Sequence, residues 1–376
     1  MIPIFKPEMN KEEIIKELGK IFDSGWIGLG PKTSEFEEKF AHYVGAKHAI
    51  GINSCTSALH LSYHSLRIKE GDEVITPSLT FASTIIPLLY QKAIPVFADI
   101  LTDTLCIDPL DIKRKITART KAIVVVHLGG HSAPMDEIWD IAKSHNLLVI
   151  EDAAHACGSE YKGKKHGGLP NTNATCFSFH AVKNLTTGDG AMITTDDTAL
   201  YERLKKLRWL DINKSTWDRI TTGCYPWEYK IDEMGFKYHM NDITSVIGLA
   251  QLKVLDKHNQ RRRAITQKYN EALEKLNWIE TPKEHNYTKS SNHMYIIKLE
   301  LRNELHEYLM NKEIQTTVHY EPAHHHKVFK DFPAQVPVTE KIWKKLLTLP
   351  LYPSMKEEEV EKVIEEIQGF GKMRNL

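Results

Sequence analysis

The sequence predicts an α/β protein built on a mostly parallel, doubly wound sheet. Strand-like apolar runs alternate with segments of helical spacing between about residues 48 and 150, which is the order expected of successive β-α-β units. The run at residues 147–152 is continuously apolar until it ends in Glu151 and Asp152, as expected of a parallel strand covered on both faces. A chain of 376 residues is also long enough for a second, smaller domain.

The elements of the large domain follow from apolar spacing and turn residues. Strands are predicted at residues 49–52, 73–77, 95–98, 121–127, 147–152, 175–179 and 191–194. Helices are predicted at residues 10–22, 34–44, 53–66, 134–145 and 200–210, and from residues 80 and 108 onward. Glycines and lysines at residues 162–168 predict a solvated hairpin, and residues 211–235 predict a long loop rich in tryptophan and tyrosine.

The C-terminal part predicts a smaller α+β domain. Residues 241–276 have helical spacing with few breakers, so they form one helix or two helices with a bend, with Arg261 to Arg263 on the surface. Beyond them, strands are predicted at residues 293–299 and 316–319, and helices at residues 301–312 and 357–370. We therefore expect a large domain over residues 1–250 and a small domain over residues 251–376.

Composition excludes several classes of function. Lysine plus arginine and aspartate plus glutamate number 49 each, so neither a nucleic-acid groove nor a polybasic membrane patch is indicated. The five cysteines form no C-x-x-C pair, so neither a zinc site nor a disulfide framework is predicted. No apolar run is long enough to span a membrane, and the N-terminus lacks the features of a signal peptide. We therefore expect a cytoplasmic protein.

One lysine stands in a position suited to covalent chemistry. Lys183 follows the strand-like residues 175–179, and Gly188 and Gly190 separate it from the next strand-like run. A lysine held between two strands is partly dehydrated, which disfavours its ammonium form and makes the amine a nucleophile near neutral pH. Such lysines form Schiff bases with aldehydes, including that of pyridoxal phosphate. The alternative is an ordinary solvated lysine on the surface.

Asp152 ends the predicted strand at residues 147–152. Ligands of open α/β sheets bind at the carboxyl ends of the strands. A carboxylate there could keep the ring nitrogen of pyridoxal phosphate protonated, which makes the ring a better electron sink. An aspartate that only caps the following turn is the alternative.

Two strand-to-helix turns add further candidates. Thr56 and Ser57 lie where a strand, a hydroxyl-rich turn and a helix N-terminus meet, and such a terminus favours an anion such as phosphate. Simple capping of the helix is the alternative. Phe81 lies at a similar turn, from which its ring could stack on a cofactor or pack into the core.

A group of histidines at residues 319–326 has the composition of a metal site. The group comprises His319, His324, His325 and His326. Adjacent histidines on a loop rarely all face one ion, and no cysteine or acidic residue stands at zinc spacing from them. We therefore predict no metal site.

Three motifs together resemble the DegT-type sugar aminotransferases, which are fold-type I pyridoxal-phosphate enzymes. They are Glu151-Asp-Ala-Ala-His-Ala, Tyr161-Lys-Gly-Lys and Phe177-Ser-Phe-His-Ala-Val-Lys-Asn. The similarity extends from about Trp26 to Pro353, and it is greatest to enzymes that place nitrogen at C4 of a nucleotide-linked sugar, such as UDP-4-amino-4-deoxy-arabinose aminotransferase. The resemblance implies a fold-type I large domain and a smaller C-terminal domain.

The resemblance also implies a role for each candidate residue. Lys183 would hold pyridoxal phosphate and move the proton, Asp152 would keep the ring nitrogen protonated, and His155 would hydrogen-bond near the phenolic oxygen. The remaining cofactor contacts would be a stacking ring and three phosphate-binding hydroxyls, from Phe81, Thr56, Ser57 and Ser178.

On the substrate side, the resemblance implies roles for Trp26, Ile27, His319 and Tyr320. Lys237 stands where the family often has an asparagine that reaches the cofactor phosphate of the neighbouring subunit. This departure leaves the contact itself open, although a lysine could serve a phosphate electrostatically.

The expected activity is transfer of an amino group from glutamate to a C4 keto group of a nucleotide-linked deoxy sugar. We expect a homodimer with shared active sites, partly because the tryptophans and tyrosines at residues 211–235 are of the kind enriched at interfaces. A cyclitol aminotransferase and a non-catalytic regulatory or binding protein remain alternatives. The family's dehydratase branch has a histidine in place of the lysine, so Lys183 argues against it.

Overall fold

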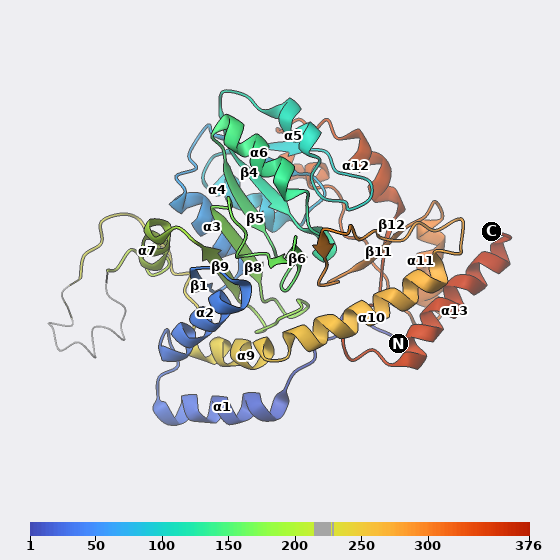
Figure 1. The fold of residues 1–376 in the computed structure, drawn as a ribbon, viewed down its shortest axis with the longest axis horizontal. Helices are drawn as coiled ribbons and strands as arrows, with labels where there is room; N and C mark the ends of the chain where they lie inside the picture. Colours follow the sequence, from blue (N-terminus) through green and yellow to red (C-terminus); the bar gives the residue numbers. More distant parts are fainter. Residues whose placement is uncertain (214–226, 228) are drawn as a thin grey trace.

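A seven-stranded sheet forms the centre of the protein, which we describe from a computed structural model covering residues 1–213, 227 and 229–376 (Figure 1). The strand order is β1-β9-β8-β5-β4-β2-β3. The bounds are β1 (His48–Ile52), β2 (Glu73–Pro77), β3 (Ile94–Ala98), β4 (Thr120–Val126), β5 (Leu148–Asp152), β8 (Ala174–Ser178) and β9 (Ala191–Thr195). β9 runs antiparallel to β1 and β8, and the other pairs in this sheet are parallel, so the prediction of a mostly parallel α/β sheet is confirmed.

Helices cover both faces of this sheet (Figure 1). One face carries α3 (Cys55–Ser65), α4 (Ile86–Tyr90) and α7 (Thr198–Leu207). The other carries α2 (Pro31–Val44), α5 (Pro109–Lys115), α6 (Met135–His145) and α9 (Asp242–Leu252), with α1 (Lys11–Ser24) packed against α9. This two-sided cover explains the continuous apolar runs in the strands, because residues on both faces of each strand are buried.

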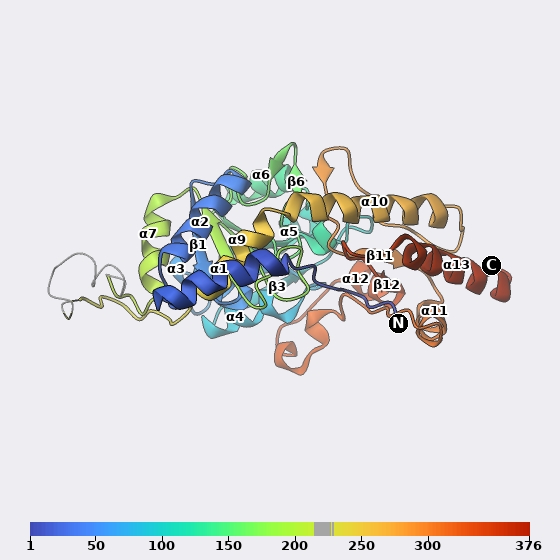
Figure 2. The ribbon, with the colours of Figure 1, turned by 90° about the horizontal axis from the view of Figure 1, so that it is seen from below.

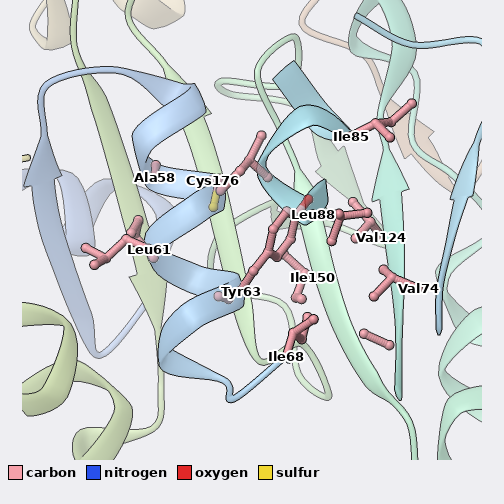
Figure 3. Close-up of a cluster of buried hydrophobic side chains, with 14 of the residues drawn as sticks. Ala58, Leu61, Tyr63, Ile68, Val74, Ile85, Leu88, Val124, Ile150 and Cys176 are labelled. Carbon is pink, nitrogen blue, oxygen red and sulfur yellow. The ribbon is translucent and has the colours of Figure 1, made fainter. Parts of the chain in front are cut away.

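The core beneath α3 fixes one wall of the site described below. Figure 3 shows Tyr63 of α3 pointing toward Leu88 and the sheet residue Ile150, which belong to the same buried cluster. In the same core, the Tyr63 hydroxyl donates a hydrogen bond of 2.9 Å to the carbonyl oxygen of Thr84. Thr84 ends the short 3-10 helix η1 (Ala82–Thr84). This bond therefore ties the turn after β2 to the buried face of α3.

The C-terminal part of the chain, where a small domain over residues 251–376 is predicted, lies beyond α9 (Figure 2). Its elements are α10 (Leu255–Leu273), β11 (Tyr295–Lys298), α11 (Arg302–Asn311), α12 (Pro337–Ile342), β12 (Leu346–Leu349) and α13 (Glu357–Arg374). Two segments cross the predicted boundary at residue 250. Ile2 is buried in the small-domain core, whereas Phe329 and Val336 are buried in a core of the large domain.

Smaller elements complete the chain. A three-stranded sheet contains β6 (Glu160–Tyr161), β7 (Lys164–Lys165) and β10 (Thr288–Lys289), and the β6–β7 pair is the predicted basic hairpin. Besides η1, 3-10 turns occur at η2 (Leu128–Gly130), η3 (Ala323–His325), η4 (Lys327–Phe329) and η5 (Trp343–Lys345).

Some predicted elements differ from the structure. The helical stretch at residues 241–276 is two helices, α9 and α10, which was one of the two possibilities left open. The prediction of a strand at residues 316–319 was wrong, because Thr317 makes only an isolated bridge to Thr348. The partner of β11 is β12, which the sequence analysis did not predict.

The prediction that Arg261 to Arg263 lie together on the surface was also wrong. Arg262 is buried and donates a hydrogen bond of 2.8 Å to the carbonyl oxygen of Leu351. Consecutive residues of an α-helix point in different directions, since one turn contains about 3.6 residues. Three adjacent arginines on α10 therefore cannot share one face.

The predicted aromatic loop at residues 211–235 lies only partly within the described residues. Trp217, Tyr225 and Pro226 fall outside them, whereas Trp227 and Tyr229 are described and exposed. Within the part of the chain that the structure describes, no helix combines the length and apolar character needed to cross a membrane.

Candidate active site

The candidate residues meet at the carboxyl edge of the sheet. Asp152 and Ser178 end the neighbouring strands β5 and β8, while the turns after β1 and β2 bring in Thr56 and Phe81. Together with Lys183, these residues line a cavity of about 340 Å³. A loop that follows α11 adds His319 and Tyr320, so both domains contribute to its wall.

Lys183 is held in the connection between β8 and β9. Its backbone amide donates to the carbonyl oxygen of His180 at 2.9 Å, and the amide of Phe179 donates to Gly190 at 2.8 Å. A side chain at Gly190 would place its Cβ 2.4 Å from the Thr187 hydroxyl oxygen, so the close approach requires glycine. Burial lowers the pKa of the Lys183 amine to about 8, although Asp152 opposes this effect. About a tenth of the amine is therefore uncharged at pH 7, far more than for a lysine of ordinary pKa.

Asp152 is buried with two neutral hydrogen-bond donors. The Thr84 hydroxyl donates to one carboxylate oxygen at 2.7 Å, and the amide of Ala154 donates to the other at 3.1 Å. Burial raises the pKa of Asp152, while these two bonds and Lys183 oppose the rise. A protonated ring nitrogen would give this buried carboxylate an opposite charge as a partner.

The ring of His155 has one partner in the large sheet region and one in the C-terminal part of the chain. The amide of Gly129 donates to its Nδ1 at 3.4 Å, and its Nε2 lies 3.2 Å from the Tyr320 hydroxyl. Burial, with a contribution from Lys183, holds the pKa of His155 well below its usual range. Since Nδ1 accepts a hydrogen bond, the neutral ring carries its proton on Nε2. That N–H faces the Tyr320 hydroxyl, and both residues line the cavity.

The three hydroxyl residues predicted to bind the phosphate differ in whether they line the cavity. Thr56 lies in the first turn of α3 and donates to the Ser83 hydroxyl at 2.8 Å. Thr56 and Ser178 both line the cavity, and so does the N-cap residue Ser54. Ser57 is not among the lining residues, and its hydroxyl lies 2.9 Å from that of Ser54. Thr56 and Ser178 therefore line the cavity near the N-terminal end of α3, where an anion would be favoured. Ser57 lies in the same helical turn, with its hydroxyl beside that of Ser54.

Comparison with known proteins shows which family the chain belongs to. The model of the DegT/DnrJ/EryC1/StrS aminotransferase family matches residues 8–368. The chain belongs to this family. Membership makes the protein an aminotransferase and confirms the resemblance found in the sequence.

Two curated relatives span nearly the whole chain. An uncharacterized protein of Methanocaldococcus jannaschii, MJ1066, is 42% identical over 377 residues, covering 98% of this chain and 97% of its own. The spore coat polysaccharide biosynthesis protein SpsC of Bacillus subtilis is 40% identical over 382 residues, covering 99% and 97%.

Solved aminotransferases confirm the fold. The PMP form of Spr1654 from Streptococcus pneumoniae has a TM-score of 0.92 and 30% identity, covering 99% of this chain and 100% of its own. Helicobacter pylori PseC, an aminotransferase in pseudaminic acid biosynthesis, has a TM-score of 0.91 and 29% identity, covering 98% of both chains.

Three residues predicted on the substrate side of the aminotransferase lie apart from Lys183. Trp26 and Ile27 line a separate cavity of about 280 Å³, together with Trp209 and His239. The Lys237 amine lies 3.2 Å from the centre of the Trp209 ring system. The two cavities have no lining residue in common. Within one chain, Trp26, Ile27 and Lys237 therefore do not line the cavity that contains Lys183.

Three residues that contact the candidate site were missed by the sequence analysis. Thr84 holds Asp152, as described above. Asn184 follows Lys183, and its side-chain oxygen accepts a hydrogen bond of 2.9 Å from His293. The His293 ring stacks on that of His155 at 4.7 Å. Asn184 could have been identified because it is adjacent to Lys183. His293 is distant in the sequence, and no pattern around it indicates a place in the site.

Proposed function

We propose that this aminotransferase uses pyridoxal phosphate to transfer an amino group from glutamate to the C4 keto group of a nucleotide-linked deoxy sugar. One observation carries the proposal: the partly deprotonated Lys183 amine and the buried Asp152 carboxylate line one cavity. The roles of SpsC and PseC in polysaccharide and pseudaminic acid biosynthesis support a sugar substrate. The PMP form of Spr1654 supports the cofactor. The free state of Cys55, Cys106, Cys157 and Cys176 supports a cytoplasmic location.

The residues of the cavity suit pyridoxal phosphate. Lys183 would hold its aldehyde carbon, Asp152 its ring nitrogen, and the hydroxyls of Thr56 and Ser178 its phosphate. When bound, the cofactor supplies an electron sink for the charge that develops on the reacting carbon. Lys183 would accept and return the proton at that carbon as a general acid and base. His155 would donate its Nε2 proton toward the ring oxygen.

A screen of keto substrates tests this function. Purified holoenzyme is mixed with glutamate and a panel of nucleotide-linked keto sugars and keto-cyclitols, and the amine products are identified by mass spectrometry. We expect the product of a nucleotide-linked 4-keto sugar to form fastest. Faster amination of a keto-cyclitol would favour the cyclitol aminotransferase, and a panel in which no member is aminated would contradict the proposed substrate class.

The rate of cofactor uptake should rise with pH. The uncharged amine is the nucleophile, and about a tenth of it is present one pH unit below the pKa. Because the Lys183 pKa is about 8, we expect uptake by the apoprotein to quicken up to that pH and then level off. The measurement is the rate at which visible absorbance of bound cofactor appears. Lys183→Ala apoprotein is the matched control, and a pH-independent rate would contradict the assignment.

We further propose a homodimer in which each subunit completes the site of its partner. Lys237 and His239 neighbour the second cavity, where Trp26 and Ile27 lie. A cofactor phosphate and a nucleotide both need cationic partners, and the exposed Lys237 could supply one across a two-fold axis. Separation of the two cavities within one chain supports a partner's contribution to the Lys183 cavity.

Subunit complementation tests the shared site. An inactive Lys183→Ala subunit is mixed with a subunit carrying Lys237→Ala and His239→Ala, under conditions where subunits exchange. We expect activity to return in the hybrid dimers, up to one working site in each. A mixture that stays inactive despite demonstrated exchange, or an active monomer in sedimentation, would contradict the proposal.

A further inference from the structure

Two adjacent histidines converge on one carboxylate outside the cavity. His324 and His325 lie in η3, and Glu340 lies in α12. The Nε2 atoms of both rings approach the same Glu340 oxygen, at 2.7 Å from His324 and 2.6 Å from His325. We call these three residues the His324 trio. Their three ligand atoms lie within 4.8 Å of one another, which is the size of a metal coordination sphere.

One ring of the His324 trio has a second hydrogen-bond partner, and all three side chains are partly exposed to solvent. The other ring nitrogen of His324 lies 2.5 Å from the Ser78 hydroxyl. Metal-binding histidines commonly have such a partner, which fixes the orientation of the ring. The side chains of His324, His325 and Glu340 are 13%, 26% and 40% exposed, so an ion could reach the ligand atoms from solvent.

A second trio shows what a purely structural network looks like in the same protein. His127, Glu151 and His166 are fully buried. Their outward ring nitrogens are already engaged, since the Ala133 amide donates to His127 and the Ser132 hydroxyl lies 2.7 Å from His166. Each group in that network has a protein partner and no route from solvent. The His324 trio differs in its exposure.

We propose that His324, His325 and Glu340 bind a divalent transition metal such as Zn²⁺, with water at the remaining position. Two imidazoles and one carboxylate form a known zinc ligand set. Ligand atoms of a tetrahedral zinc site lie about 3.3 Å apart, given bonds of about 2.0–2.1 Å. The ring nitrogens and the carboxylate oxygen would therefore separate by several tenths of an ångström to admit the ion. The half-exposed Glu340 side chain has room for this shift.

This proposal differs from the sequence prediction of no metal site. That prediction found no acidic residue at zinc spacing from the histidines. Glu340 comes from a separate helix, and α12 is positioned by Asp99, whose carboxylate accepts bonds of 2.8 Å from the amides of Val338 and Thr339. Only the folded chain brings this carboxylate to the histidines.

A metal at the trio would reinforce the wall of the active-site cavity. Ser78 precedes the turn that carries Phe81, and the amide of Ala323 donates to the Ser78 carbonyl oxygen at 2.8 Å. The loop that carries His324 also carries Tyr320, whose ring lies 5.7 Å from that of Phe81. The ion would thus connect this loop to α12 beside both rings.

Zinc titration of matched variants tests the proposal. ZnCl2 alone is titrated into metal-free holoenzyme by calorimetry, using wild type, His325→Asn, Glu340→Gln and His326→Asn. His326 is next in the chain but outside the trio, so His326→Asn controls for general loss of a histidine. We expect one zinc equivalent in wild type and His326→Asn, and at least tenfold weaker binding in the other two. The thermal midpoint should rise with zinc only where the site is intact.

Other outcomes would overturn the proposal. Binding that is equal in all four proteins would place zinc elsewhere, on surface histidines or on the cofactor. Equal loss in His326→Asn would show that zinc binding depends on the histidines of this loop in general and is not specific to the trio. Metal-free melting curves check the fold, and the less drastic His325→Gln replaces His325→Asn if that variant unfolds.

Discussion

Lys183→Ala is expected to abolish transamination while the fold survives. The substitution removes both the amine that would hold the cofactor and the group that would move the proton. Proton transfer alone contributes about 10²–10⁴-fold, and loss of the covalent attachment adds to it. We expect no turnover above background in a coupled assay of glutamate consumption. Lys164→Ala, which removes an exposed lysine of β7, should keep normal activity.

Chemical trapping locates the attachment independently of activity. Borohydride reduction of the holoenzyme fixes the cofactor to its lysine, and peptide mapping identifies the residue. We expect one labelled peptide, which contains Lys183. Label on a different lysine would remove Lys183 from its role, even if the Lys183→Ala variant were inactive.

The fold should survive Lys183→Ala because the substitution removes a buried amine whose charged form is disfavoured in the folded protein. Folding lowers the pKa of Lys183 from 10.5 to about 8, so the unfolded chain binds more protons between these values. Stability contributed by this group therefore rises with pH from about 8 to 10.5. In denaturant unfolding of the apoproteins, wild type should gain stability over this interval relative to Lys183→Ala. A constant difference would mean that the Lys183 pKa is not lowered in the folded protein.

Asp152→Asn is expected to retain cofactor but lose most of the rate. The amide keeps the shape of the side chain but cannot offer a negative charge to a ring nitrogen. Loss of such a charged contact in a closed site costs ~2–4 kcal/mol, which corresponds to a roughly thirtyfold to thousandfold lower kcat. The measurement is kcat at saturating substrates, with cofactor content determined by absorbance.

A matched control separates this effect from a general loss of charge. Asp136→Asn removes an exposed carboxylate that pairs with Lys162 on the surface, and it should leave kcat unchanged. Turnover near the wild-type value in Asp152→Asn would contradict the role of this carboxylate. Loss of cofactor without any change in rate per bound cofactor would also contradict it.

The parts of the site that sequence could predict are those fixed by local pattern. An apolar run followed by a polar residue marks the carboxyl end of a buried strand, and Asp152 and Ser178 both lie at such ends. Since parallel strands share one carboxyl edge, the neighbourhood of Lys183 and Thr56 followed from the order of the elements. The fold class followed from the same alternation.

What sequence could not predict depends on contacts between distant segments. Glu340 meets His324 only because α12 packs beside the loop, and His293 reaches His155 from another domain. Side-chain direction was a second limit. Ser57 follows Thr56 directly but turns toward Ser54, because adjacent residues of a helix point about 100° apart.

The bonds of Asn184 fasten the lysine-bearing loop to the C-terminal part of the chain. Its side-chain amide nitrogen donates to Asn259 of α10 at 2.8 Å and to the Ser291 carbonyl oxygen at 2.9 Å, and its oxygen receives the His293 bond. The position of the reactive amine therefore depends on contacts made by Asn259, Ser291 and His293. Substitution of these partners would misplace the nucleophile, and catalytic rate is sensitive to such misplacement even when the substituted residue does not touch the reacting atoms.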